Sequence, residues 1–241
     1  MNKKDKKVFS FFSFVPLRKT VFAIIVFFVA AVFAQADVYD YPLKAETKAA
    51  FEKTSNQFAN FPFIKGSFEQ EKYLNRLNRS LLSSGNFIIA TDLGMVWDTL
   101  KPFPSTLVLG ENYLVQSRPG GQKTVLSAEG NETFISMAEV ISAVFSGNTK
   151  KLLENFEVFY SENGTAAGVA SKGNISSWEI GLIPKDKTIN SFAVKITMKG
   201  DSAIRSILIN EQNGDSITYN LSNHSYPKEL TLNEKSFFTI P

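Results

Sequence analysis

Residues 61–99 read FPFIKGSFEQEKYLNRLNRSLLSSGNFIIATDLGMVWDT, and this stretch decides the fold. Two runs of β-forming residues, 63–73 and 81–90, flank a polar link, and a third run follows at residues 95–99. Links this short join antiparallel neighbours, because a parallel crossover needs a dozen residues or more. The stretch therefore predicts an antiparallel meander.

Alternate residues of a strand share a face, so Phe68 and Gln70 point one way and Glu69 and Glu71 the other. The glutamates are expected on the solvated face, because Glu is rarely buried. The Gln70 amide would then either bind a ligand's polar group or hydrogen-bond to neighbouring backbone.

Two glycines, Gly66 and Gly85, interrupt the first two runs. Glycine inside a strand weakens it and often marks a bulge or bend. The sequence thus predicts a curved sheet with one apolar face, on which Met95 and Trp97 point together.

The N-terminus has the pattern of a secretory signal peptide. Basic residues precede the apolar run VFAIIVFFVAAVF at residues 21–33, and Ala34-Gln35-Ala36 matches a small-x-small cleavage site. The run is shorter than the roughly 20 residues that span a bilayer, although an uncleaved anchor is the alternative. We expect cleavage after residues 1–36 and export to the periplasm.

Charge and composition exclude several functions. Residues 1–36 hold six Lys or Arg and one Asp, so their removal turns the net charge of +3 into −2, and no basic stripe for nucleic acid remains. The chain has no cysteine, which excludes disulfides, thiol catalysis and Cys-ligated zinc. A single histidine likewise excludes His-rich metal sites. Neither a metal nor a cofactor is expected.

The pattern of apolar residues in the remaining chain, residues 37–241, predicts one α+β domain. An amphipathic helix is expected at residues 42–58 and a second at 132–145, where apolar residues recur at helical spacing. Short β runs fill the rest, including the final apolar run at 237–240, and give about ten strands.

Several motifs occur in the order found in a known family. Gly66-Ser67-Phe68-Glu69-Gln70 resembles the G-x-F-x-Q start of the periplasmic outer-membrane lipoprotein carrier family, LolA, and Ser84-Gly85-Asn86-Phe87 resembles its S-G-x-F step. Met95-Val96-Trp97 with Pro102 is similar to its tryptophan strand. Residues 178–185, with Trp178, Leu182 and Pro184-Lys185, are similar to its W-x-x-x-L-x-P-K strand.

A LolA-related branch is still more similar, with F-x-Q-E-K at residues 68–72 and W-x-T-x-x-P-F-P-S at 97–105. Members of that branch are often encoded beside lipid- or aryl-polyene-assembly enzymes and membrane exporters. The resemblance implies a cargo that need not be a lipoprotein.

The resemblance implies a single curved antiparallel sheet forming an unclosed half-barrel, with helices as a lid over an apolar cavity. It implies a monomeric carrier without enzymatic activity, which takes acylated or otherwise hydrophobic cargo from an inner-membrane transporter to an outer-membrane acceptor. One departure concerns the lid: Thr91-Asp92 stand where LolA has the Arg-Pro pair that helps to hold it.

On that fold the expected cavity wall comes from the sheet and from the lid helix. The sheet residues are Phe68, Phe87, Met95, Trp97, Leu107 and Leu109, and the lid residues are Phe134, Met137 and Ile141. Methionine is unbranched and suits a wall that repacks.

Two other functions stay open. A sensor on the same half-barrel would bind a stray lipid and signal to a partner, and a lipid head-group enzyme would need a nucleophile and a base. The only histidine, His224, lies in the polar stretch Ser222–Pro227 and is expected to be a solvated surface residue. No catalytic residue is therefore assigned.

Overall fold

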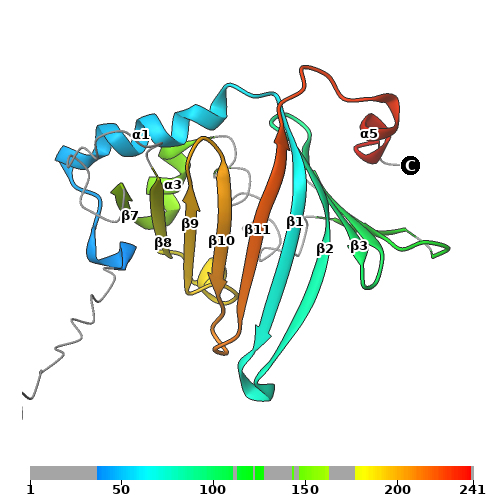
Figure 1. Ribbon diagram of the computed structural model, residues 1–241, viewed down its shortest axis with the longest axis horizontal. Coiled ribbons are helices and arrows are strands. Elements are labelled where there is room, and N and C mark those ends of the chain that lie inside the picture. Colours follow the sequence, from blue (N-terminus) through cyan, green and yellow to red (C-terminus); the bar gives the residue numbers. More distant parts are fainter. Residues whose placement is uncertain are drawn as a thin grey trace, which may run out of the picture. The chain divides into compact units, whose positions relative to one another are not determined.

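The computed structural model describes residues 37–110, 113–121, 123–127, 143, 147–162 and 177–239. Within these ranges, eleven strands form one antiparallel sheet in the order β6-β5-β4-β3-β2-β1-β11-β10-β9-β8-β7 (Figure 1). Their bounds are β1 Phe63–Leu74, β2 Arg79–Ala90, β3 Gly94–Lys101, β4 Ser105–Leu109, β5 Tyr113–Ser117, β6 Thr124–Ser127, β7 Phe156–Glu162, β8 Trp178–Pro184, β9 Lys195–Gly200, β10 Ile204–Asn210 and β11 Ser216–Ser225.

The described helical segments are η1 Val38–Asp40, α1 Ala45–Ala59, η2 Asn75–Leu77, α3 Thr149–Asn155, α4 Lys187–Asn190 and α5 Leu232–Phe237. Among them, α1 is the longest and the others are short. The helix expected at residues 132–145 lies outside the described residues except for Ala143, which is helical and buried.

The strand order explains why the sheet is open. The chain starts at the centre with β1, moves outward to the edge strand β6, resumes at the opposite edge with β7, and returns to β11 beside β1. The edges β6 and β7 do not pair with each other in this order, so the sheet curls without closing. The predicted unclosed half-barrel with an α+β composition is confirmed.

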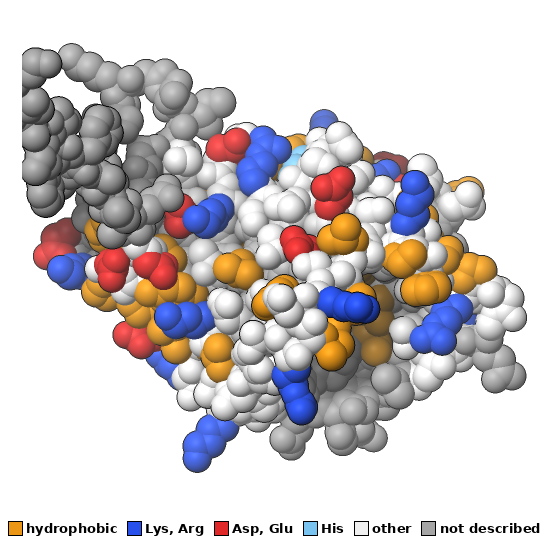
Figure 2. Space-filling model, turned by 60° about the horizontal axis from the view of Figure 1, so that its bottom comes forward, with side chains coloured by type: hydrophobic (Ala, Val, Ile, Leu, Met, Phe, Trp, Pro, Cys, Tyr) orange, Lys and Arg blue, Asp and Glu red, His pale blue; other side chains and the backbone are white. Residues whose placement is uncertain are grey.

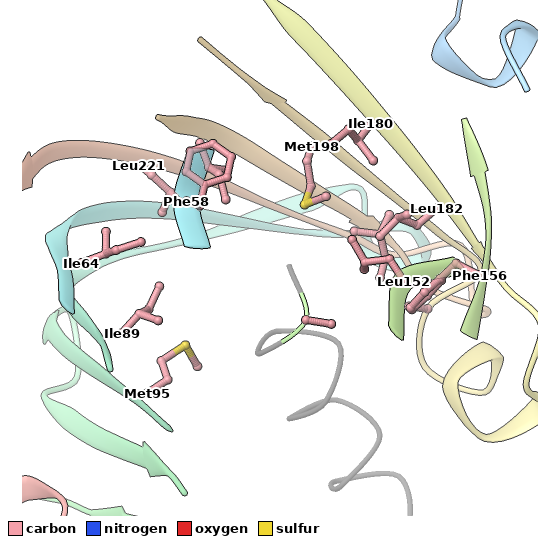
Figure 3. Close-up of a cluster of buried hydrophobic side chains, with 14 of the residues drawn as sticks. Phe58, Ile64, Ile89, Met95, Leu152, Phe156, Ile180, Leu182, Met198 and Leu221 are labelled. Carbon is pink, nitrogen blue, oxygen red and sulfur yellow. The ribbon is translucent and has the colours of Figure 1, made fainter. Parts of the chain in front are cut away.

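The concave face of the sheet carries the main apolar cluster. Alternate residues of strands β1 to β5 contribute Ile64, Ile89 and Met95 to this cluster. Strands β7 and β8, in the other half of the sheet, contribute Phe156 and Leu182. Figure 3 shows these side chains facing one another across the space between the two halves. Ala143 belongs to the same cluster.

Helix α1 covers the β7–β8 side of this face. Phe51 is fully buried and meets the Tyr160 ring at 5.9 Å between centroids, and Phe58 meets the Trp178 ring at 5.8 Å. Thr54 Oγ1 lies 2.7 Å from Tyr160 Oη, and that hydroxyl donates in turn to Glu162. The amphipathic pattern predicted this helix because Phe51 and Phe58 are seven residues apart, two turns along one stripe.

The convex face has a smaller cluster of its own. Val96, Val108 and Val115 alternate away from the concave face and pack with Leu230 and Phe238 of the C-terminal segment. Tyr113 Oη donates to the Phe238 carbonyl oxygen at 3.1 Å. The C-terminal segment thus covers β2 to β5 from outside.

Two local predictions were wrong. The C-terminal run expected as β includes the end of α5, because Thr231 and Glu234 form a reciprocal capping box that starts a helix. The alternation expected from Phe192 begins as a strand only at Lys195, since α4, capped by Asp186, precedes it.

Both predicted glycine irregularities are present. The β1–β11 register shifts between Lys65 and Ser67, at Gly66, and the β2–β3 register shifts between Ser84 and Gly85. A Cβ on Gly85 would lie 1.9 Å from the Asp98 carbonyl oxygen, so only glycine lets β3 approach.

Replacing that glycine tests whether this close approach supports the sheet. We expect Gly85→Ala to lower the free energy of unfolding by about 1–3 kcal/mol, because β3 must move away from the new methyl group. Urea denaturation measures the difference. Gly121→Ala is the matched control, since a Cβ there meets nothing closer than 3.4 Å. Equal stability of the two variants would contradict the assignment.

Candidate functional site

Four strands at the centre of the sheet place an aromatic group on the concave face. The Trp97 ring stacks on Phe68 with centroids 4.2 Å apart and on Phe87 at 5.8 Å, and its edge meets Tyr219 at 5.1 Å. Phe87 of β2 is paired with Trp97 of β3, and Phe68 of β1 is paired with Gly85 of β2. Because Gly85 has no side chain, the rings can overlap above its backbone. Phe68 and Phe87 are buried, whereas Trp97 is half-buried.

The predicted aliphatic wall adjoins this group. Met95 is paired with Leu109 across β3 and β4, and Trp97 is paired with Leu107. Met95 and Leu109 are each 6% exposed, and Leu107 is half-buried. All six sheet residues proposed for the wall therefore lie on one face and touch a single apolar cluster. Phe134, Met137 and Ile141 lie outside the described residues.

Two hollows of the described surface lie elsewhere. One, of about 410 Å³, is lined by Gln70, Leu82 and Lys101 among others, and the second, of about 340 Å³, lies between β1–β3 and Phe237. Phe87 touches the second, but Met95, Trp97, Leu107 and Leu109 line neither. Four of the six wall residues are buried and Trp97 and Leu107 are half-buried, so full contact with a ligand would require packed neighbours to move.

Burial shifts the pKa of Tyr219 in this region, and that of His224, which is described below. Desolvation, assisted by the negative charge of Glu211, raises the pKa of Tyr219 to about 12. The phenol therefore stays neutral, and its ring edge remains a suitable partner for Trp97. The predicted solvated glutamates of β1, Glu69 and Glu71, are exposed.

The prediction that His224 is a solvated surface residue was wrong. His224 belongs to β11, and its ring meets Phe87 at 5.8 Å between centroids. Within the described residues, neither ring nitrogen has a hydrogen-bond partner, and both are shielded from solvent. Asn223 adopts φ 53°, which turns the following side chain toward the concave face. The inward orientation of His224 could not be predicted from the sequence, because the polar residues around it do not indicate a β-bulge.

Burial lowers the pKa of His224, and the nearby Arg205 guanidinium lowers it further against the opposing effect of Asp201. In the window below the ordinary value of 6.5, the unfolded chain therefore binds more protons than the native one. Native stability should fall as the pH drops through that window.

Replacing this histidine tests the linkage. We expect the free energy of unfolding of the natural chain to decrease between pH 7.5 and 5.5, and that of His224→Phe to decrease less, because phenylalanine keeps the Phe87 contact and cannot take a proton. Urea denaturation at a series of pH values measures both slopes. Parallel slopes would show that His224 does not carry the effect.

A cluster of metal-binding side chains and a membrane-spanning helix are both absent from the described residues. No group of three His, Cys, Asp or Glu side chains within them could hold a metal ion. In the same part of the chain, none of the helices has the length and apolar character needed to cross a bilayer. What distinguishes the site is its apolar, aromatic surface.

No family model and no curated protein sequence matches the chain. Several solved structures are similar at low identity. A LolA superfamily protein from Nitrosomonas europaea is 10% identical over 80% of this chain and 97% of its own, with a TM-score of 0.43. An outer-membrane lipoprotein-sorting domain from Vibrio parahaemolyticus is 12% identical over 84% of this chain and 99% of its own, with a TM-score of 0.41.

MucB is also similar, at 10% identity over 80% of this chain and 63% of its own length, with a TM-score of 0.44. These are likenesses only, and the fold assignment rests on the strand order and register. The described chain is an eleven-stranded half-barrel with an aromatic, apolar concave face.

Proposed function

We propose that this protein is a carrier that shelters an acylated or otherwise hydrophobic molecule against the concave face of the half-barrel. The observation that carries the proposal is the continuous apolar surface formed by Phe68, Phe87, Met95 and Trp97, with Trp97 only half-buried. An open sheet with an apolar face and a separate cover suits a guest that must enter and leave.

The energetics require such a surface. Each buried methylene stabilises an acyl chain by about 0.8 kcal/mol, so a chain of sixteen carbons gains about 13 kcal/mol from shelter. A carrier must supply most of that and still release its cargo. The concave face, with the flexible Met95 side chain and the stacked aromatic rings, offers apolar contact without specific hydrogen bonds. Such contact favours release of the cargo over permanent retention.

Room for the guest would come from movement of the cover. Helix α1 is attached through Phe51, Thr54 and Phe58 to β7 and β8, and Gln57 donates to the Asp201 carbonyl oxygen. Beneath the helix, Ser55 Oγ is buried without a partner in the described structure. Lifting α1 would hydrate that hydroxyl, which offsets part of the cost of exposing its apolar stripe.

Location and direction complete the proposal. The signal-peptide pattern of residues 1–36 supports export, and the mature domain would be residues 37–241. The carrier would then work in the periplasm, receiving cargo from an inner-membrane transporter and delivering it to an outer-membrane acceptor. A lipoprotein acyl group and a free lipid-like molecule both suit this wall, since it would contact apolar surface rather than a head group.

Trp97 provides a direct readout of cargo binding. The chain has two tryptophans, and a fatty acid carrying bromine on its chain quenches an indole that it touches. We expect dibrominated stearic acid to quench the natural protein, and the Trp97→Phe variant, which retains Trp178, to be quenched much less. Equal quenching of both proteins would place the acyl chain away from the proposed wall.

Two substitutions on the wall test affinity. Met95→Glu places a charge on the concave face and should abolish binding. Leu107→Gln places an uncharged polar side chain at a half-buried position and should weaken binding at least about ten-fold. This change corresponds to roughly 1.4 kcal/mol of lost apolar contact. Asn86→Glu is the control, because Asn86 is exposed on the opposite face of the sheet. Undiminished binding by a folded Leu107→Gln protein would overturn the wall assignment.

Mass spectrometry of organic extracts from the natural protein, purified from the periplasm, would identify the cargo. Lipid or acyl species should be recovered from the natural protein, in lower yield from a folded Leu107→Gln variant, and not from a folded Met95→Glu variant. Recovery of no apolar species at all, from protein prepared without detergent, would count against carriage.

A further inference from the structure

One end of the sheet exposes an unusual number of large apolar side chains. Among the described residues, five of the nine exposed large hydrophobic side chains lie in two short segments: residues 75–82, which include the turn after β1 and the start of β2, and residues 100–103, which include the end of β3 and the turn after it. They are Leu77 at 64% exposure, Leu81 at 56%, Leu82 at 68%, Leu100 at 49% and Phe103 at 82%. We name these two segments the hairpin tip.

The two segments are neighbours in space. Ser84 is paired with Lys101 where β2 meets β3, and the hollow of about 410 Å³ is walled by Leu82 on one side and Pro102 on the other. Exposed leucines scattered singly need no explanation, but a contiguous group marks a surface that meets another apolar phase.

The tip is held rigidly in this exposed form. Asn75 N donates to Asp215 Oδ1 at 2.8 Å, and Tyr73 Oη donates to Asn78 Oδ1 at 2.8 Å. Asn78 takes the left-handed conformation that closes the turn, with φ 46°. The leucines are therefore presented by a fixed hairpin, whose β1 strand is also paired with β11 on its other side.

Charge identifies the kind of surface that the tip fits. Its two segments carry Arg76, Arg79 and Lys101, all exposed, and contain no acid. Acids of adjoining segments lie nearby: Glu69 and Glu71 line the hollow with Lys101, Glu71 accepts a hydrogen bond from Ser80, and Asp215 accepts one from Asn75 N. Figure 2, which brings this end of the molecule forward, shows hydrophobic side chains lying among charged side chains of both signs.

Leucine and phenylalanine side chains beside cations are the composition that lies at a bilayer interface, where apolar groups enter the acyl region and cations meet lipid phosphates. Lys and Arg stems can also extend along the apolar surface while keeping their charge in the head-group layer. The charge of −2 expected for residues 37–241 would repel an anionic surface elsewhere, so the tip alone sets the orientation.

From these observations we infer that the hairpin tip docks the protein on an anionic lipid bilayer. The docking is peripheral: Leu82 and Phe103 enter the interface, and Arg76, Arg79 and Lys101 meet the head groups. It requires no cargo and stands whether or not the concave face carries one.

The absence of cysteine from the chain makes a local test simple. Leu82→Cys and Phe103→Cys each accept a single environment-sensitive fluorophore, and Leu232→Cys, at an 84% exposed leucine of α5, is the matched control. With vesicles containing about 30% phosphatidylglycerol, the two tip probes should brighten and shift to the blue, and lipids with a nitroxide on the acyl chain should quench them. The control probe should do neither.

This readout separates tip docking from attachment through residues 21–33. Equal changes at all three probes would mean that the protein associates by another segment, and unchanged tip probes would mean that it does not dock; either result overturns the proposal. Exclusive response to a purified membrane protein, without response to protein-free vesicles, overturns it as well.

The cations are tested in the labelled Phe103→Cys background. Each cation near an anionic surface contributes about 1 kcal/mol, so Arg76→Glu combined with Arg79→Glu should raise the vesicle concentration at half signal by at least about ten-fold. The response should weaken with added salt and with purely zwitterionic vesicles. A half-signal concentration unaffected by the charge reversal would contradict the role of the cations.

Discussion

The pairing of β1 with β11 is the interaction on which the rest of the structure depends. It joins the strand at the start of the sheet to the strand at its end and so makes one sheet from two meanders, β1–β6 and β7–β11. The concave cluster takes side chains from both meanders, so neither could bury its apolar face in the same way alone. Because these strands lie some 150 residues apart in the sequence, their pairing carries a high loop-closure entropy cost, which is typical of slow-folding β proteins.

The same joint creates the candidate site. Tyr219 comes from β11, Phe68 from β1, Phe87 from β2 and Trp97 from β3, and the four rings meet only where the two meanders join. The glycine opposite Phe68 in β2 leaves space above the backbone for the rings to overlap. A surface made in this way is apolar and broad and has few hydrogen-bonding groups, which suits shelter better than recognition.

Local features of the fold could be predicted from the sequence, because local chemistry determines them. Alternation predicted the faces of Phe68 and Trp97, and short links predicted antiparallel pairing. Gly66 and Gly85 marked two of the three register shifts between the described strands; the third, between Ile204 and Ser206 of β10, has no glycine in that strand. Features that depend on distant partners could not be predicted from pattern alone. Nothing near β11 in sequence states that it pairs with β1, and the burial of His224 follows from a bulge at Asn223 and from the position of Phe87 on another strand.

The N-terminal segment of the described chain passes from one face of the sheet to the other around β7. Val38 and Tyr39 lie against Gly181 and Phe159 on the convex side, Pro42 bridges to Phe159 along the strand, and α1 then continues over the concave side. Leu43 N donates to the Val158 carbonyl oxygen and Tyr160 N donates to the Tyr41 carbonyl oxygen, each at 2.9 Å, so two outer backbone groups of β7 are already occupied. An open sheet offers such groups as a template for a foreign strand. Residues 41–43 therefore cover part of this edge and leave less free backbone there for pairing with a strand of another copy.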